Sequence, residues 1–156
     1  MRMMLTKTLE VLNTRHVKDI MKMLEGQFGV TEKLQLGFLR SNKDKVYVIN
    51  KDVDRVDIKD FRVDSIGMYF GAYMKDGFRL SIEGSQLVGR LAKKNVLELM
   101  DEEKHEWMKG NDIGIEKEDG FYIVKWKDDF LGCGKLKNNK LLNSVPKPRR
   151  LIVVNE

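Results

Sequence analysis

The residues best suited to chemistry lie near the C-terminus, where glycine and lysine alternate. Gly132 and Gly134 are followed by Lys135 and, two positions further on, by Lys137. Because glycine has no side chain, its backbone can come close to a phosphate group, and the neighbouring lysines would supply positive charge. The same two glycines would also permit a bulge in a curved strand. The residues alone leave both interpretations, phosphate contact and bulge, open.

A second group of cations accompanies two prolines. Lys147 lies between Pro146 and Pro148, and Arg149 and Arg150 follow directly. Proline fixes φ, so such a segment loses less conformational entropy when it becomes ordered on a ligand. We therefore expect these three cations to clamp a phosphate backbone.

The net charge of +5 is concentrated in the same region. Between positions 135 and 156 six lysines and arginines accompany a single acid, Glu156, whereas the other 134 residues hold 23 basic and 23 acidic groups. Clustered lysine and arginine are typical of a phosphate-binding face. A solvated edge strand kept soluble by lysine would produce the same pattern, so charge alone does not decide between them.

The two tryptophans could stack on unpaired bases, as aromatic side chains do. Trp107 and Trp126 each belong to a periodic apolar pattern, however, and aromatic residues in such patterns usually belong to the core. We therefore expect both tryptophans to be core residues.

The first half of the chain predicts one helix and two hairpins. The helix begins after Asn13 or Thr14 and ends at Gly29, with apolar residues at helical spacing between them. Alternating apolar residues at 34–38 and 46–49 flank a turn at 41–44. Residues 65–71 and 77–82 form the second pair, around the strong hairpin signal Asp76-Gly77.

The second half predicts short helices and many short strands. Ser85 is the expected cap of one helix and Asp101 of another that runs to about Lys109. Strands are expected at 95–99, 120–126, 130–136, 141–142 and 151–154. Short strands separated by turns predict a small barrel, and the densely charged stretch 51–64 marks the expected junction between two parts of the chain.

Residues 132–150 resemble the signature of the PUA-like RNA-binding domain that ends RNA cytosine-5 methyltransferases of the Sun/RsmF type. The shared order is glycine, any residue, glycine, lysine, a short hairpin, leucine, an asparagine-containing step, proline, lysine and arginine. Upstream, Trp107, Lys109, Gly110 and Ile113 match a further step, and residues 79–87 resemble another. The chain departs from the pattern at Val145, where an aromatic residue is usual, and at Gly84, where proline is usual.

The resemblance implies an α+β protein in two parts. Residues 1–63 would form a small α/β domain of helix and hairpin, and residues 64–156 a PUA-like mixed β pseudobarrel with short helices. The expected RNA contacts are Gly132, Gly134, Lys135, Lys137, Lys140, Lys147, Arg149, Arg150, Lys93 and Lys94. For Lys93 and Lys94 a solvated loop is the competing interpretation.

The function expected from this resemblance is binding of structured RNA, tRNA or rRNA, as a targeting or accessory module in RNA modification or ribosome assembly. An RNA methyltransferase or a ribosomal component would be a further partner. The alternative is an adaptor that docks an acidic protein, such as a methyltransferase subunit, through the basic tail. The oligomeric state stays open.

Catalysis has little support in the residues. Cytosine-5 methyl transfer needs a cysteine nucleophile and a methyl donor bound in a glycine-rich α/β fold, whereas Cys133 follows Gly132 and no such glycine-rich loop is present. His16 and His105 lie far apart in the sequence, outside any metal-ligand spacing. We expect a non-enzyme without cofactor or metal.

Charged residues interrupt every apolar stretch, so no membrane-spanning segment is expected. The single cysteine cannot form an internal disulfide, and residues 1–12 lack the apolar core of a signal peptide. These features favour the cytoplasm.

Overall fold

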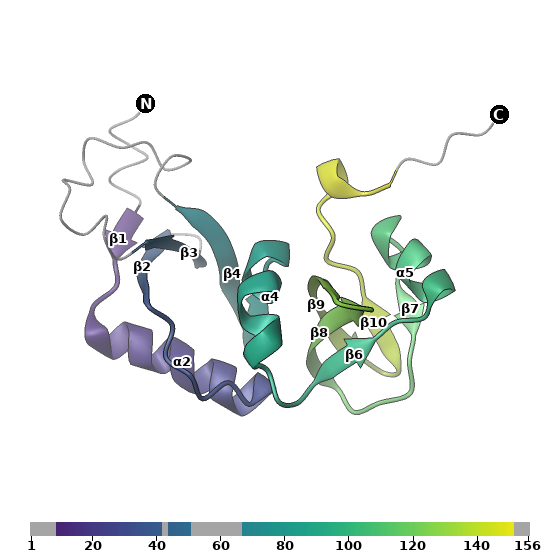
Figure 1. The fold of residues 1–156 in the computed structure, drawn as a ribbon, viewed down its shortest axis with the longest axis horizontal. Helices are drawn as coiled ribbons and strands as arrows, with labels where there is room; N and C mark the ends of the chain where they lie inside the picture. Colours follow the sequence, from purple (N-terminus) through teal and green to yellow (C-terminus); the bar gives the residue numbers. More distant parts are fainter. Residues whose placement is uncertain (1–8, 42–43, 51–66, 152–156) are drawn as a thin grey trace.

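The computed structural model describes residues 9–41, 44–50 and 67–151, and its elements form two sheets (Figure 1). The first sheet is an antiparallel meander with the strands in sequence order. Its elements are β1 (Leu9–Val11), α2 (Thr14–Phe28), β2 (Leu36–Ser41), β3 (Lys45–Asn50), β4 (Met68–Met74) and β5 (Gly77–Leu80). Figure 1 shows α2 running along this sheet.

The second sheet has the strand order β6-β8-β9-β10-β7 and curls into a half-barrel. The β6–β8 pair is parallel and the other pairs are antiparallel. Its elements, with the helices beside it, are α4 (Ile82–Val88), η3 (Gly89–Leu91), β6 (Val96–Glu98), α5 (Asp101–Met108), β7 (Ile113–Gly114), β8 (Gly120–Trp126), β9 (Asp129–Lys137), β10 (Lys140–Leu142) and η4 (Lys147–Arg149). The predicted α+β class with a PUA-like pseudobarrel is confirmed.

Helix α2 forms where the sequence predicts it. The Asn13 side chain accepts a hydrogen bond from the His16 amide at 3.0 Å, which makes Asn13 the cap, and Gly29 ends the helix with φ 68°. Ile20, Leu24 and Phe28 are fully buried along one stripe. The helix is therefore held by its apolar face, and its opposite face is exposed.

Two expected helix caps were wrong. Ser81 caps α4 by accepting from the Gly84 amide at 2.9 Å, whereas Ser85 lies inside the helix and is buried. Asp101 is already helical, and its carboxylate accepts from the Trp126 indole N–H at 2.8 Å. Ser81 and Ser85 are both residues that commonly cap helices. Which of them caps α4 depends on how the first turn of the helix packs, and the sequence does not show this.

One apolar cluster joins the two sheets. Leu24 and Phe28 of α2 and Phe78 of β5 pack in it together with Phe121 of β8 and Cys133 of β9. A second cluster packs Trp107 of α5 against Val124, Leu136 and Leu141 of the second sheet. The two halves of the chain therefore share one core.

The predicted pair at 34–38 and 46–49 forms as β2 and β3, and the pair at 65–71 and 77–82 forms as β4 and β5, except that Ser81 and Ile82 belong to the start of α4 and residues 65–66 lie outside the described residues. The strands expected at 95–99, 120–126, 130–136 and 141–142 form as β6, β8, β9 and β10. The charged stretch 51–64 and residues 152–154 of the last expected strand lie outside the described residues. The division into residues 1–63 and 64–156 remains a prediction. It falls between β3 and β4, which pair within one sheet, and the change from the first sheet to the second lies between β5 and β6.

Within the described part of the chain, no helix has the length and apolar character needed to cross a membrane.

Candidate nucleic-acid interface

The β9–β10 hairpin presents two lysines at its tip. Asn138 and Asn139 form the two-residue turn with φ 52° and 61°, a left-handed conformation that asparagine tolerates and that matches the twist of the strands. The turn pairs Lys137 directly with Lys140, and both side chains are exposed. No carboxylate of the described residues forms an ion pair with either lysine.

Lys135 lies two residues before Lys137, so both side chains are on the same face of β9. Its ammonium group forms an ion pair with the Asp76 carboxylate in the β4–β5 turn and lies 6.0 Å from the centroid of the Phe121 ring. The hydrogen bond from Lys135 lowers the pKa of Asp76, and the charge of Lys137 acts in the same direction. Lys135 thus ties the two sheets together.

Gly132 and Gly134 are both buried, and their assignment as phosphate contacts stays a prediction. Gly132 has φ 140° and lies where the β8–β9 register shifts, which agrees with the bulge interpretation. At Gly134 a Cβ atom would lie 2.8 Å from the Trp107 ring and 2.9 Å from the Leu142 carbonyl oxygen. Gly132 therefore permits the bulge in β9, and Gly134 leaves space for the Trp107 ring.

The three cations of the tail are positioned by different contacts. Arg149 forms an ion pair with Glu83 of α4 at 2.5 Å. Arg150 donates from Nε to the Val145 carbonyl at 2.9 Å and packs over Gly110, where a Cβ would lie 2.5 Å from the arginine side chain. Lys147 is exposed and forms no ion pair within the described residues. Of the three, Lys147 is the one whose side chain forms no ion pair or hydrogen bond with the described residues.

Lys93 and Lys94 lie at the C-terminal end of α2, where both backbone amides donate to the Phe28 carbonyl. The Lys93 ammonium group also bonds Thr31 at 2.7 Å and Glu32 at 3.1 Å, and this contact lowers the pKa of Glu32. Figure 1 shows the segment before β6 and the segment η4 on opposite sides of the molecule. The structure therefore does not bring these two lysines to the tail.

The expectation for the tryptophans holds for Trp107 and was wrong for Trp126. Trp107 is the fully buried residue of α5, and its indole N–H has no partner in the described part of the chain. Trp126 is half-buried outside both large clusters. The ammonium groups of Lys104 and Lys127 lie 4.3 and 4.7 Å from its ring centroid. Its position at the end of a hairpin, beside the first turn of α5, keeps it at the surface.

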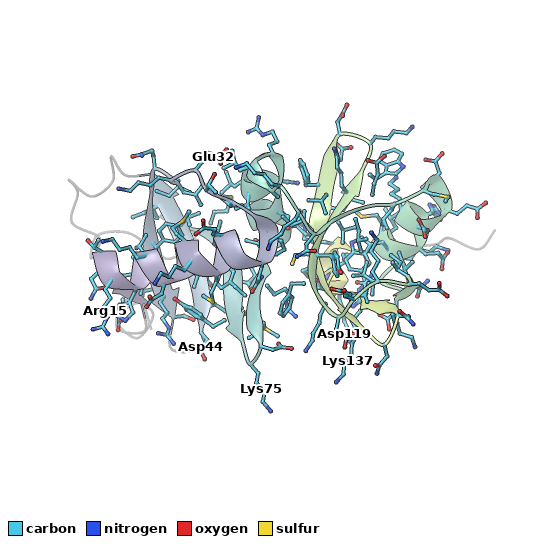
Figure 2. All side chains as sticks on the ribbon, turned by 90° about the horizontal axis from the view of Figure 1, so that it is seen from below. Arg15, Glu32, Asp44, Lys75, Asp119 and Lys137 are labelled. Atoms are coloured by element: carbon cyan, nitrogen blue, oxygen red, sulfur yellow. The ribbon has the colours of Figure 1, made fainter. Side chains whose placement is uncertain are left out.

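Sequence reasoning missed Lys75, which lies beside Asp76 in the β4–β5 turn. Figure 2 shows Lys75 and Lys137 projecting from the same edge of the molecule, with Asp119 beside Lys137. The sequence around Lys75 predicts only a turn, from Asp76-Gly77. It does not predict that this turn lies beside the β9–β10 hairpin.

Cys133 is fully buried, and burial raises the pKa of its thiol to about 12. The thiol therefore stays protonated near neutral pH and is a poor nucleophile. In the described ranges, no three histidine, cysteine, aspartate or glutamate side chains gather as a metal site.

Residues 94–151 match the family model described as the methyltransferase RsmF PUA domain. This segment covers β6 to η4, the elements of the second sheet and the tail.

Three similar proteins carry the name ribosomal RNA small subunit methyltransferase F. The one from Aeromonas salmonicida is 28% identical over 138 residues, which cover 87% of this chain and 28% of the relative. The Shewanella piezotolerans protein is 28% identical, and the alignment covers 88% of this chain and 29% of the relative. The Vibrio parahaemolyticus protein is 27% identical, and the alignment covers 58% of this chain and 20% of the relative. The chain thus spans less than a third of the length of these relatives.

Proposed function

We propose that this chain, whose residues 94–151 form a PUA domain of the RsmF type, is a non-catalytic RNA-binding module that contacts ribosomal RNA. The names of the relatives favour rRNA over tRNA, because each is a ribosomal RNA small subunit methyltransferase. The buried, protonated Cys133 supports a non-catalytic role. Such a module would position an RNA methylation reaction in the cytoplasm.

The exposed lysines at the hairpin and tail carry the proposal. Lys137, Lys140 and Lys147 form no ion pair within the described residues, so their charges are available to phosphate groups. Phosphate contacts by lysine give binding that depends on shape and salt rather than on base sequence. The expected recognition is therefore of a structured RNA backbone.

A titration of labelled rRNA fragments and of tRNA at several salt concentrations tests this function. Wild-type protein should bind an rRNA fragment with a steep dependence on salt, and the triple variant Lys137→Ala, Lys140→Ala, Lys147→Ala should bind more weakly with a flatter dependence, because three phosphate contacts are lost.

The matched control removes the same charge elsewhere. Arg15, Lys18 and Lys22 are exposed on the outer face of α2, without ion pairs in the described structure, and Arg15 lies at the far end of that helix in Figure 2. If their triple alanine variant loses as much affinity as the first, binding is diffuse and the proposed surface is wrong. If wild-type protein binds no RNA at low salt, the function itself is wrong, and an adaptor role toward an acidic protein takes its place.

A further inference from the structure

We propose that Lys75, outside the segment matched by the PUA family, joins Lys137 and Lys140 in one phosphate-binding surface on structured RNA, here called the junction surface. This inference rests on the proposed RNA-binding function and extends it into the first half of the chain. It assigns the β4–β5 turn a direct part in recognition.

The ion pair between Lys135 and Asp76 brings the two turns together. Asp76 is the neighbour of Lys75 in the chain, and Lys135 lies on the same strand face as Lys137. The hydrogen bond from Lys135 lowers the pKa of Asp76, and the charge of Lys137 acts in the same direction. Lys75 and Lys137 project from one edge of the molecule in Figure 2. The cations of both turns therefore face the same space.

The junction surface contains positive charge that the described residues do not compensate. Lys137 and Lys140 are direct cross-strand partners, and like charges in that position destabilise a sheet. Of the two nearby acids, Asp76 is paired with Lys135, whereas Asp119 accepts the Asn138 amide at 3.0 Å and keeps its negative charge, so the lysines outnumber it. Lys75, Lys137 and Lys140 form no ion pair with the described residues. A bound phosphate would relieve this repulsion.

The β4–β5 turn is held rigidly against the second sheet. At Gly77 a Cβ atom would lie 2.5 Å from the Gln27 side-chain oxygen and 2.8 Å from the Phe121 ring, so the turn packs closely on both. Gln27 also bonds the Phe78 backbone twice, accepting from its amide at 2.7 Å and donating to its carbonyl at 2.8 Å. Lys75 is thus placed beside the hairpin before any ligand arrives, which lowers the entropy cost of binding.

The test compares Lys75→Ala with Lys33→Ala, another exposed lysine of the first half without an ion pair in the described structure. Both are measured in the whole chain against the rRNA fragment that wild-type protein binds. Lys75→Ala should weaken binding roughly tenfold at low salt and reduce the slope of log affinity against log salt by about one, as expected for one lost phosphate contact. Lys33→Ala should leave both unchanged, and Lys75→Arg should retain the slope.

The inference and the proposed function fail in distinguishable ways. If Lys75→Ala behaves like Lys33→Ala while Lys137→Ala weakens binding, RNA binding stands and the junction surface is wrong. If wild-type protein binds no RNA, both are overturned. A thermal melt of each variant shows that it is folded. In the double variant of Lys75 and Lys137, a loss smaller than the sum of the single losses supports a shared contact, and full additivity argues against one.

Discussion

At the residue scale, Gly132 and Gly134 have structural roles in β9. The sequence alone did not decide between such a role and contact with phosphate. Their spacing matches the family pattern, yet both positions are buried. Gly132 lies at a bulge, and Gly134 makes room for Trp107. The pattern thus preserves the shape of β9, and the cations of the same segment reach the surface because strand geometry alternates the two faces.

Gly134→Ala should destabilise the protein by about 1–3 kcal/mol, because the added methyl group overlaps the Trp107 ring and a backbone oxygen. Urea unfolding followed by tryptophan fluorescence measures the change. Gly114→Ala is the matched control, since nothing lies within 4 Å of the Cβ it would add. Equal stability of both variants would contradict the packing described for Trp107.

The Asp76 carboxyl should titrate below its ordinary pKa, since the hydrogen bond from Lys135 favours the charged form. A depressed folded-state pKa means that the contribution of this pair to stability is present above the unfolded-state pKa and is lost as pH falls through the folded-state value. Carbon-13 NMR of the carboxyl group follows the titration. Lys135→Gln should move the pKa of Asp76 upward, and an unchanged value would mean that the ion pair does not form in solution.

At the element scale, the sequence predicts which segments become helices and strands more reliably than where they begin. Periodic apolar residues and turn residues are local signals, and they place α2, β8, β9 and β10 correctly. The cap of α4 and the position of Trp126 depend on contacts with distant segments. Lys75 escaped detection for the same reason, because the approach of its turn to β9 is a tertiary contact.

Ser81→Ala should destabilise the protein by about 1–2 kcal/mol, the usual effect of losing a helix cap. The Ser81 hydroxyl accepts from the Gly84 amide at 2.9 Å and donates to the Tyr69 carbonyl at 2.5 Å, so α4 is anchored to β4 through it. Chemical unfolding of Ser81→Ala and Ser85→Ala compares the two serines. Ser85→Ala should cost less, because the Ser81 carbonyl that its hydroxyl bonds also accepts from the Ser85 amide. A larger loss of stability in Ser85→Ala than in Ser81→Ala would contradict the assignment of Ser81 as the cap of α4.

At the scale of the whole molecule, the two sheets are joined too closely to act as independent parts. The Asn95 side chain donates to the Gln27 carbonyl at 2.5 Å near the end of α2, and Phe78 and Phe121 share one apolar cluster. The family match begins at residue 94, yet the similar proteins align with up to 88% of the chain. The similarity to these proteins therefore extends into the first half of the chain, beyond the segment that the family model matches.

The shared core predicts a single cooperative unfolding transition. Leu24→Ala removes a fully buried side chain of α2 and should cost about 2–5 kcal/mol. Both tryptophans lie in the second half of the chain, so their fluorescence reports that half, while far-UV circular dichroism reports all elements. The substitution in α2 should shift both transitions by the same amount, because unfolding of the first half exposes Phe121, Ile123 and Cys133 of the second. A variant in which dichroism falls first and the tryptophan transition keeps its wild-type midpoint would show that the second sheet is stable alone, and the rigid placement of Lys75 beside the hairpin would then lose its basis.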